Sequence, residues 1–127
     1  MQKTLFPALA ALAMIAATPA AALAQATVYR CAFTKECATT GCAQVSYEAT
    51  IRQEGARAEY GDELELWPLL VVAPLEGDGA SYASPPSYGA SRMITRFATG
   101  DVVMSVHFND AGGLGAFWAT GRCSEEN

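Results

Sequence analysis

Basic residues are scarce in this sequence, whose 127 residues include 8 lysines and arginines against 13 acids, a net charge of −5. A nucleic-acid-binding protein needs a basic face to neutralise phosphate, and a protein that docks on an anionic membrane needs a basic patch. The charge balance argues against both functions. The hydrophobic fraction of 51% argues against a disordered chain, and the length suffices for one small domain.

Motifs of common catalytic and cofactor sites are also absent. The sequence contains no Cys-x-x-Cys, no Gly-x-Ser-x-Gly and no phosphate-binding loop. His107 is the only histidine, and it shares a predicted strand face with Ser105, so a hydrolase using His107 stays as an alternative to a non-catalytic protein. Asp62, Glu63 and Glu65 lack the ligand spacing of an EF-hand, and we expect them to lie in an edge strand with charges outward. The sequence therefore predicts no cofactor and no metal site.

The first residues have the pattern of a secretory signal peptide. Lys3 precedes an uncharged run over residues 5–17, and a proline and small residues then lead to two Ala-x-Ala cleavage sites. The run is too short to cross the roughly 30 Å of a membrane's hydrocarbon core, so no membrane anchor is expected. We expect residues 1–26 to be removed, with cleavage after Ala24 as the alternative. The mature domain, residues 27–127, then lies in the periplasm or outside the cell.

Four cysteines remain in that domain: Cys31, Cys37, Cys42 and Cys123. An even count in a small exported domain predicts two disulfides. In a closed barrel the first and last strands are neighbours, which favours Cys31–Cys123. Cys37–Cys42 would then close one loop, in which Gly41 supplies the turn. The alternative is Cys31–Cys37 with Cys42–Cys123.

Short strands, without helical periodicity, account for most of the mature chain. Apolar and polar side chains alternate over residues 45–52, and a turn leads to a second strand over residues 56–60. Further strands are predicted over residues 27–34, 69–73, 80–83, 93–97, 102–108 and 114–123, with loops over residues 35–44 and 84–91. Gly115 and Gly121 in the last strand indicate bends or close backbone approach. The pattern predicts an all-β fold, a small antiparallel barrel or sandwich of about seven to eight strands stapled by disulfides.

Tyr82, Tyr88 and the prolines Pro85 and Pro86 form a candidate recognition surface. A proline-rich segment loses little conformational freedom on binding, which favours recognition. The alternative is a polar loop that only connects two strands.

Several short motifs match one known family. The chain has Tyr-x-Cys at residues 29–31 and a cysteine near its end. Gly79 and Tyr82 match two positions of a Ser-Gly-x-x-Tyr loop. Phe97 and Gly100 match two positions of a Phe-Trp-x-Lys-Gly turn. In these features the chain resembles the small periplasmic inhibitors of C-type lysozyme, which are exported bacterial β-barrels of about this size. The resemblance implies the same fold and compartment.

The residues that carry inhibition in that family are not matched. Asp78 stands where the family has its inhibitory serine, and no lysine is present near Thr99. In the family these two groups enter the lysozyme cleft and meet its catalytic carboxylates, so Asp78 would be repelled and an attractive partner is missing. We therefore add Asp78 to the candidate surface and expect a non-catalytic binding domain for an envelope protein or a small ligand. Lysozyme inhibition through other residues is the alternative.

Overall fold

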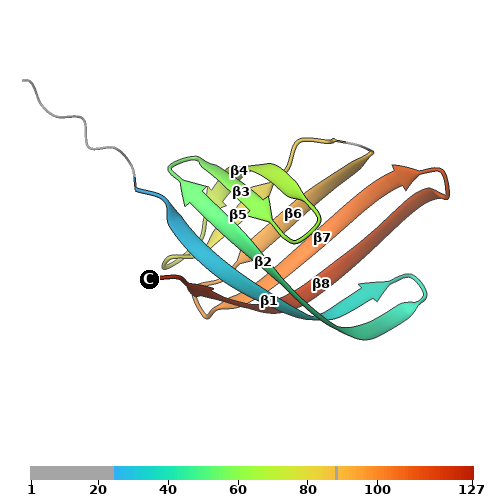
Figure 1. Cartoon of the computed structure of the whole chain (residues 1–127), viewed down its shortest axis with the longest axis horizontal. Coiled ribbons are helices and arrows are strands. Elements are labelled where there is room, and N and C mark those ends of the chain that lie inside the picture. The colour runs from blue at the N-terminus through green and yellow to red at the C-terminus, as the bar shows by residue number, and fades with distance from the viewer. Residues whose placement is uncertain (1–24, 88) are drawn as a thin grey trace, which may run out of the picture.

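The structure is a computed structural model that describes residues 25–87 and 89–127. Its strands are β1 (Thr27–Ala38), β2 (Gly41–Glu54), β3 (Arg57–Gly61), β4 (Leu66–Pro74), β5 (Ala80–Ala83), β6 (Ala90–Arg96), β7 (Asp101–Asp110) and β8 (Gly113–Glu125). Each strand pairs antiparallel with the next, and β8 returns to β1, so the sheet closes into a barrel (Figure 1). The all-β prediction is confirmed, in its barrel form. The predicted signal peptide lies outside the described residues, except for Gln25 and Ala26.

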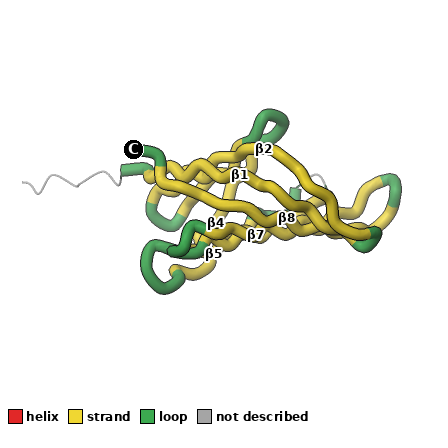
Figure 2. The backbone as a smooth tube through the Cα atoms, turned by 90° about the horizontal axis from the view of Figure 1, so that it is seen from below, coloured by secondary structure: helices red, strands yellow, loops and turns green. Residues whose placement is uncertain are grey.

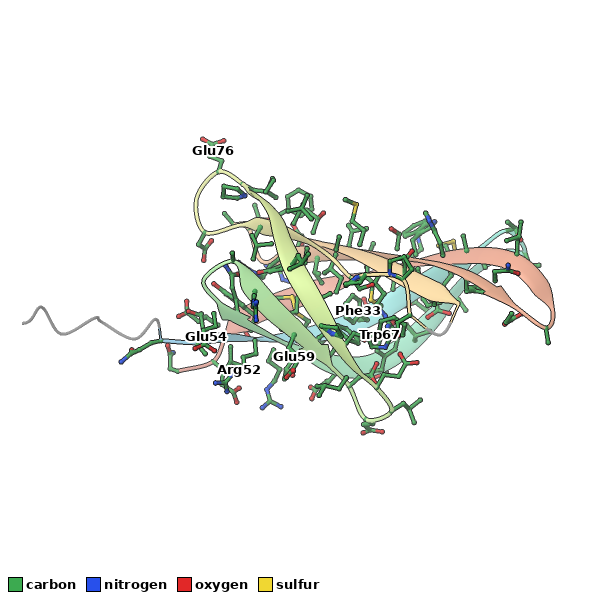
Figure 3. The ribbon with its side chains drawn as sticks, turned by 90° about the horizontal axis from the view of Figure 1, so that it is seen from above. Phe33, Arg52, Glu54, Glu59, Trp67 and Glu76 are labelled. Atoms are coloured by element: carbon green, nitrogen blue, oxygen red, sulfur yellow. A yellow bond between two sulfur atoms is a disulfide. The ribbon has the colours of Figure 1, made fainter. Side chains whose placement is uncertain are left out.

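Side chains fill the barrel interior because every second residue of each strand points inward. In β2 the predicted apolar face is the inner one, with Ala49 and Ile51 buried and Tyr47 partly buried. The interior of an eight-stranded barrel is wide enough either for side chains or for one small ligand, and in this barrel large side chains occupy it. Figure 3 shows Phe33 and Trp67 between the ribbons, and both are buried. The largest fully buried side chains are Tyr60, Tyr82, Phe33, Ile51, Leu69, Ile94, Val102 and Cys31.

Both predicted disulfides are confirmed. Cys31 in β1 lies directly opposite Cys123 in β8, and the two are bonded where the barrel closes. Cys37 is bonded to Cys42 across the β1–β2 hairpin. Closure also depends on Gly121, because a Cβ there would lie 2.0 Å from the carbonyl oxygen of Ala32. The predicted close backbone approach in the last strand is therefore present.

The predicted loop over residues 35–44 is wrong. β1 continues to Ala38 and β2 begins at Gly41, so only Thr39 and Thr40 form the turn. The register shifts between Phe33 and Lys35, which marks a β-bulge. A bulge inserts one residue and interrupts the alternation of two, so the strand cannot be recognised from its pattern beyond that point.

The predicted edge strand that would contain Asp62, Glu63 and Glu65 is also wrong. Residues 62–65 form the loop between β3 and β4, in which Asp62 Oδ1 accepts hydrogen bonds from the backbone N–H groups of Leu64 and Glu65, each at 2.8 Å. An aspartate that binds the backbone two and three residues ahead favours a turn over a strand. A closed barrel moreover has no edge to protect.

The loops divide between two ends of the barrel. The turn at residues 55–56, the loops 75–79 and 97–100 and both ends of the described chain lie at one end (Figure 2). The loop 62–65, residues 84–87 and the tips of the β1–β2 and β7–β8 hairpins lie at the other, where these two hairpins extend beyond the shorter strands (Figure 1). From residue 25 onward, Tyr88 excepted, no helix is long and apolar enough to cross a membrane.

Candidate functional site

The structure separates the residues of the predicted recognition surface. Asp78 is exposed in the β4–β5 loop, whereas Pro85 and Pro86 are exposed in the β5–β6 loop, so β5 carries them to opposite ends of the barrel. Tyr82 lies between them but points inward and is 0% exposed, so its assignment to a surface is wrong. It faces inward because every second residue of this segment, Ala80, Tyr82 and Ser84, points into the core. Tyr88 lies outside the described residues.

Asp78 belongs to a barrel end built by two loops, residues 75–79 and 97–100, which we call the paired-loop end. Backbone hydrogen bonds close each loop on itself, from Leu75 N–H to the Gly79 carbonyl at 3.0 Å and from Gly100 N–H to the Phe97 carbonyl at 2.9 Å. The loops also touch each other, because a Cβ on Gly77 would lie 2.8 Å from the Cβ of Ala98. The paired loops therefore hold one shape, and Glu76 projects at the tip of the first (Figure 3).

Arg96 supports the paired-loop end from inside the barrel. Its side chain is 4% exposed, and its guanidinium carbon lies 3.6 Å from the centroid of the Tyr29 ring. Nη2 donates a hydrogen bond of 2.6 Å to the carbonyl oxygen of Asp78. Nε and Nη2 each donate to the Tyr82 hydroxyl oxygen at 3.4 Å, and that hydroxyl donates to Gln53 Oε1 at 2.7 Å. A buried charged donor thus fixes the loop that carries Asp78.

The electrostatics of this end are mixed. Arg96 Nη1 lies 4.0 Å from Asp78 Oδ2, which is an ion pair without a hydrogen bond. On the rim, Arg122 donates to Asp101 Oδ1 at 2.8 Å and to the Thr99 carbonyl at 2.9 Å. Burial raises the pKa of Tyr29, and the positive charge of Arg96 opposes that rise. The end therefore offers both charge signs to a ligand.

Two depressions open on the paired-loop end and share the wall formed by Phe97, Ala98 and Thr99. One has a volume of about 240 Å³ and polar walls that include Asp78, Arg96 and Arg122. The other has a volume of about 480 Å³, with Leu75 and Phe97 among its mostly apolar walls. Phe97 itself is 42% exposed. An apolar hollow beside a charged one can hold a ligand that carries both kinds of group.

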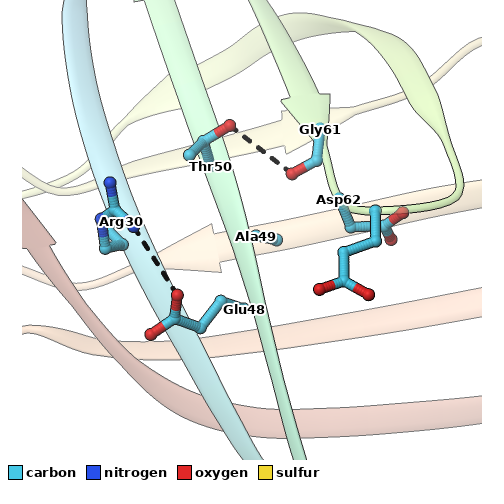
Figure 4. A pocket seen from close by; sticks show the side chains of 7 residues that line it. Arg30, Glu48, Ala49, Thr50, Gly61 and Asp62 are labelled. Atoms are coloured by element: carbon cyan, nitrogen blue, oxygen red, sulfur yellow. Dashed lines mark hydrogen bonds and ion pairs between the residues drawn. The ribbon is translucent and has the colours of Figure 1, made fainter.

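A further depression of about 370 Å³ lies outside β1, β2 and β3 (Figure 4). Arg30 Nη1 lies 3.6 Å from Glu48 Oε2 across it, and Arg30 also binds Glu126 at 2.8 Å. Asp62 borders it with both oxygens already occupied, since Oδ2 accepts the Tyr60 hydroxyl at 2.9 Å. Within the described residues, no three His, Cys, Asp or Glu side chains gather in a way that could hold a metal ion. Polar groups here bind one another, which suits a structural role.

A second inward-facing arginine, Arg92, lies near the other end of the barrel with its side chain 9% exposed. The guanidinium carbon of Arg92 lies 4.1 Å from the Trp67 ring and 5.1 Å from the Tyr60 ring, and it pairs with Glu65. Trp67 Nε1 donates to the same Glu65 oxygen at 2.9 Å. Burial and the hydrogen bond to Asp62 raise the pKa of Tyr60 far above its ordinary value.

Sequence reasoning missed both internal arginines. In β6 they alternate with Met93, and a period of two gives one face with Arg92, Ile94 and Arg96 and another with Met93 and Thr95. Hydrophobicity favours neither face as the inner one. The aromatic residues that cover the guanidinium groups come from other strands, so the signal that an arginine can be buried is non-local.

His107 is exposed on the outer surface of β7. Its cross-strand neighbours are Ser91 and Ala116, and Ser105 follows two positions away on the same face, as predicted. None of these neighbours is a carboxylate that could orient an imidazole as a general base. The site therefore has no feature that favours the hydrolase alternative.

Comparisons with known proteins give no further assignment. A scan against protein-family models, a search of curated proteins and a search of solved structures found no match to this chain.

Proposed function

We propose that this protein is a non-catalytic binding domain of the bacterial periplasm, and that the paired-loop end is its binding site. The observation that carries the proposal is the hydrogen bond from buried Arg96 to the Asp78 carbonyl, which fixes an exposed loop from beneath. A loop held in one conformation loses little entropy when a partner binds. The shared wall of Phe97, Ala98 and Thr99 adds an apolar anchor beside charged groups.

An envelope protein is the partner that suits this end best. Exposed aromatic residues surrounded by polar groups are typical of protein interfaces. Glu76, Asp78 and Phe97 are exposed on two adjacent loops, so one partner surface can contact all three. A small envelope ligand in the 480 Å³ depression is the second possibility.

The cysteines and the first residues support the proposed compartment. All four cysteines are disulfide-bonded, which is compatible with an oxidising extracytoplasmic compartment. β1 begins at Thr27, so cleavage after Ala26 would leave the barrel complete. N-terminal sequencing of the exported protein should give Thr27, or less abundantly Gln25. Intact Met1 on exported material would contradict the signal peptide.

Affinity capture tests the binding site. The mature, oxidised protein is immobilised and exposed to periplasmic extract, beside Phe97→Ala and the control Pro85→Ala/Pro86→Ala, which alters the opposite end. We expect one stoichiometric protein partner that the control retains and Phe97→Ala loses. If only the Pro85→Ala/Pro86→Ala variant fails to capture the partner, the binding site lies at the β5–β6 loop instead. A catalytic turnover abolished by His107→Ala would replace the proposal with an enzyme.

A lysozyme inhibitor is the second candidate. Asp78 and Thr99, the positions that the resemblance marks, come from different loops and line the same depression. That placement supports a recognition role for this end even though neither residue is the one the family uses. The inhibition assay described in the Discussion separates this candidate from other partners.

A further inference from the structure

Two buried side chains that line the polar depression of the paired-loop end keep polar atoms free for a ligand. The Arg96 side chain is 4% exposed and Tyr29 is 8% exposed. Arg96 Nε and Nη2 are hydrogen-bonded, but in the part of the chain that the structure describes Arg96 Nη1 and the Tyr29 hydroxyl have no hydrogen-bond partner. The enclosed side-chain nitrogens and oxygens that lack a partner there belong to Arg92, so these two atoms are accessible. Two donors on buried side chains thus face the depression.

Exposed carboxylates line the same depression. Asp78 and Glu125 are exposed, and neither carboxylate accepts a hydrogen bond from the described residues. Asp78 Oδ2 lies 4.0 Å from Arg96 Nη1, which is too far for a hydrogen bond, so each group can still bind a ligand group of opposite charge. The remaining charge, Arg122, is already paired with Asp101. Unused groups of both signs therefore face one volume of about 240 Å³.

A ligand with a single charge does not suit this arrangement. An anion would be attracted by Arg96 but repelled by Asp78 and Glu125, and the reverse holds for a cation. A molecule that carries both charges satisfies both sets of groups, and it has no net charge to be repelled by the chain's −5. An α-amino acid holds its carboxylate and its ammonium group on one carbon atom. These two groups can therefore face Arg96 Nη1 and Asp78 Oδ2 at the same time.

The neighbouring apolar depression sets the nature of the ligand's side chain. This depression has a volume of about 480 Å³ and shares the wall of Phe97, Ala98 and Thr99 with the polar one. A ligand whose charged head lies in the polar depression can extend an apolar group past Phe97 toward Leu75. Mostly apolar walls with a few placed polar groups are typical of small-ligand sites.

We propose that the paired-loop end binds a free α-amino acid with a large apolar side chain. The carboxylate accepts hydrogen bonds from Arg96 Nη1 and the Tyr29 hydroxyl, the ammonium group donates to Asp78 and Glu125, and the side chain packs on Phe97. The Tyr29 hydroxyl keeps its proton for this bond, because burial raises its pKa. The inference rests on the proposed function in taking this end as the binding site, and it gives a chemical class to the small ligand named there.

Nuclear magnetic resonance titration of the mature, oxidised protein tests the proposal. The probes are racemic phenylalanine and racemic leucine, which supply both enantiomers. Phenylpropanoate lacks the ammonium group, phenylethylamine lacks the carboxylate, and alanine lacks the large side chain. We expect phenylalanine or leucine to shift the amide signals of residues 75–79 and 97–100. The three truncated probes should bind about tenfold more weakly, since each loses a charged hydrogen bond or the apolar contact.

A charge removed from the depression gives a second test. Asp78→Ala leaves the backbone carbonyl that Arg96 holds, and its carboxylate holds no other described residue, so the loop should keep its shape. We expect this variant to bind phenylalanine about tenfold more weakly and phenylpropanoate no more weakly than the wild type, because the anion no longer meets a like charge. The matched control Glu63→Ala removes one charge from an exposed loop at the opposite end and should bind like the wild type.

Three results would overturn the inference: no shift with either amino acid at millimolar concentration, shifts confined to other residues, or equal binding of phenylalanine and phenylpropanoate. Each would leave the proposed protein partner to its own test, since capture from extract and its loss in Phe97→Ala need no amino acid. Amino-acid binding by a protein that captures no partner would support the inference and argue against the protein partner.

Discussion

Arg96, at the end of β6, donates a 2.6 Å hydrogen bond to the carbonyl oxygen of Asp78, eighteen positions earlier in the chain and in the β4–β5 loop. We expect Arg96→Met to break this support, which should cost about 1–3 kcal/mol because a part-buried acceptor loses a charged donor. Hydrogen exchange at the amides of residues 75–79 should accelerate at the same time. Arg122→Met is the matched control, since that side chain is 69% exposed and its loss should change stability by less than about 0.5 kcal/mol. If Arg96→Met and Arg122→Met change stability and hydrogen exchange equally, Arg96 does not hold the β4–β5 loop in place.

The two disulfides should contribute unequally to stability. They close rings with sequence separations of 92 and 5 residues. The loop-entropy relation gives about 4.6 kcal/mol for the long ring and about 2.2 kcal/mol for the short one. Cys31→Ala/Cys123→Ala should therefore lower the melting temperature more than Cys37→Ala/Cys42→Ala. If Cys37→Ala/Cys42→Ala lowers the melting temperature more, the denatured chain between Cys31 and Cys123 is already restricted without the long-range disulfide.

The strand pattern predicted the barrel because one period of two holds over most of the mature chain. Residues 45–52 and 102–108 alternate without interruption, and their apolar faces are the inner ones. The prediction failed beyond Phe33, where a bulge breaks the period, and at residues 62–65, where the hydrogen bonds of Asp62 convert an alternating segment into a loop.

The candidate site was harder to predict, since it depends on contacts between distant strands. Asp78 was selected through a resemblance, and nothing local to the sequence shows that Arg96 reaches it. Tyr82 looked like a surface aromatic in a segment with little hydrophobic pattern. Its burial depends on partners from other strands, Gln53 and Arg96, that a local reading cannot supply.

Inhibition of C-type lysozyme should be weak or absent in the wild type. Asp78 presents a carboxylate where the resembling family has serine, and Thr99 brings no positive charge, so the lysozyme carboxylates are repelled. A turbidity assay with micromolar protein checks this, and stoichiometric inhibition would contradict it. Asp78→Ser/Thr99→Lys removes the repulsion and adds an ammonium group, so we expect it to inhibit more strongly than the wild type. Ser46→Lys controls for the added charge.

Alkaline pH should destabilise the fold through tyrosines whose pKa is raised, and Tyr47 and Tyr60 have the larger shifts. Burial, and then the negative charge of Glu36, raise the pKa of Tyr47 to about 12, and burial with the Asp62 hydrogen bond raises the pKa of Tyr60 further. An unfolded tyrosine has a pKa of about 10. Above that pH the unfolded chain releases protons that the folded chain retains. The unfolded state then binds fewer protons, and the free energy of unfolding falls as pH rises. The stabilisation is complete below about pH 10 and decreases through the folded-state pKa values.

Urea unfolding from neutral pH to about pH 12, followed by circular dichroism, measures this slope. Tyr60→Phe should lower stability at neutral pH by about 1 kcal/mol, since the hydrogen bond to Asp62 is lost. It should also flatten the alkaline slope, because the group with the larger shift is gone. Tyr47→Phe should flatten the slope less, as that side chain is only partly buried. Tyrosinate absorbance that rises near pH 10 for every tyrosine of the folded protein, before the circular dichroism changes, would contradict the expected shifts.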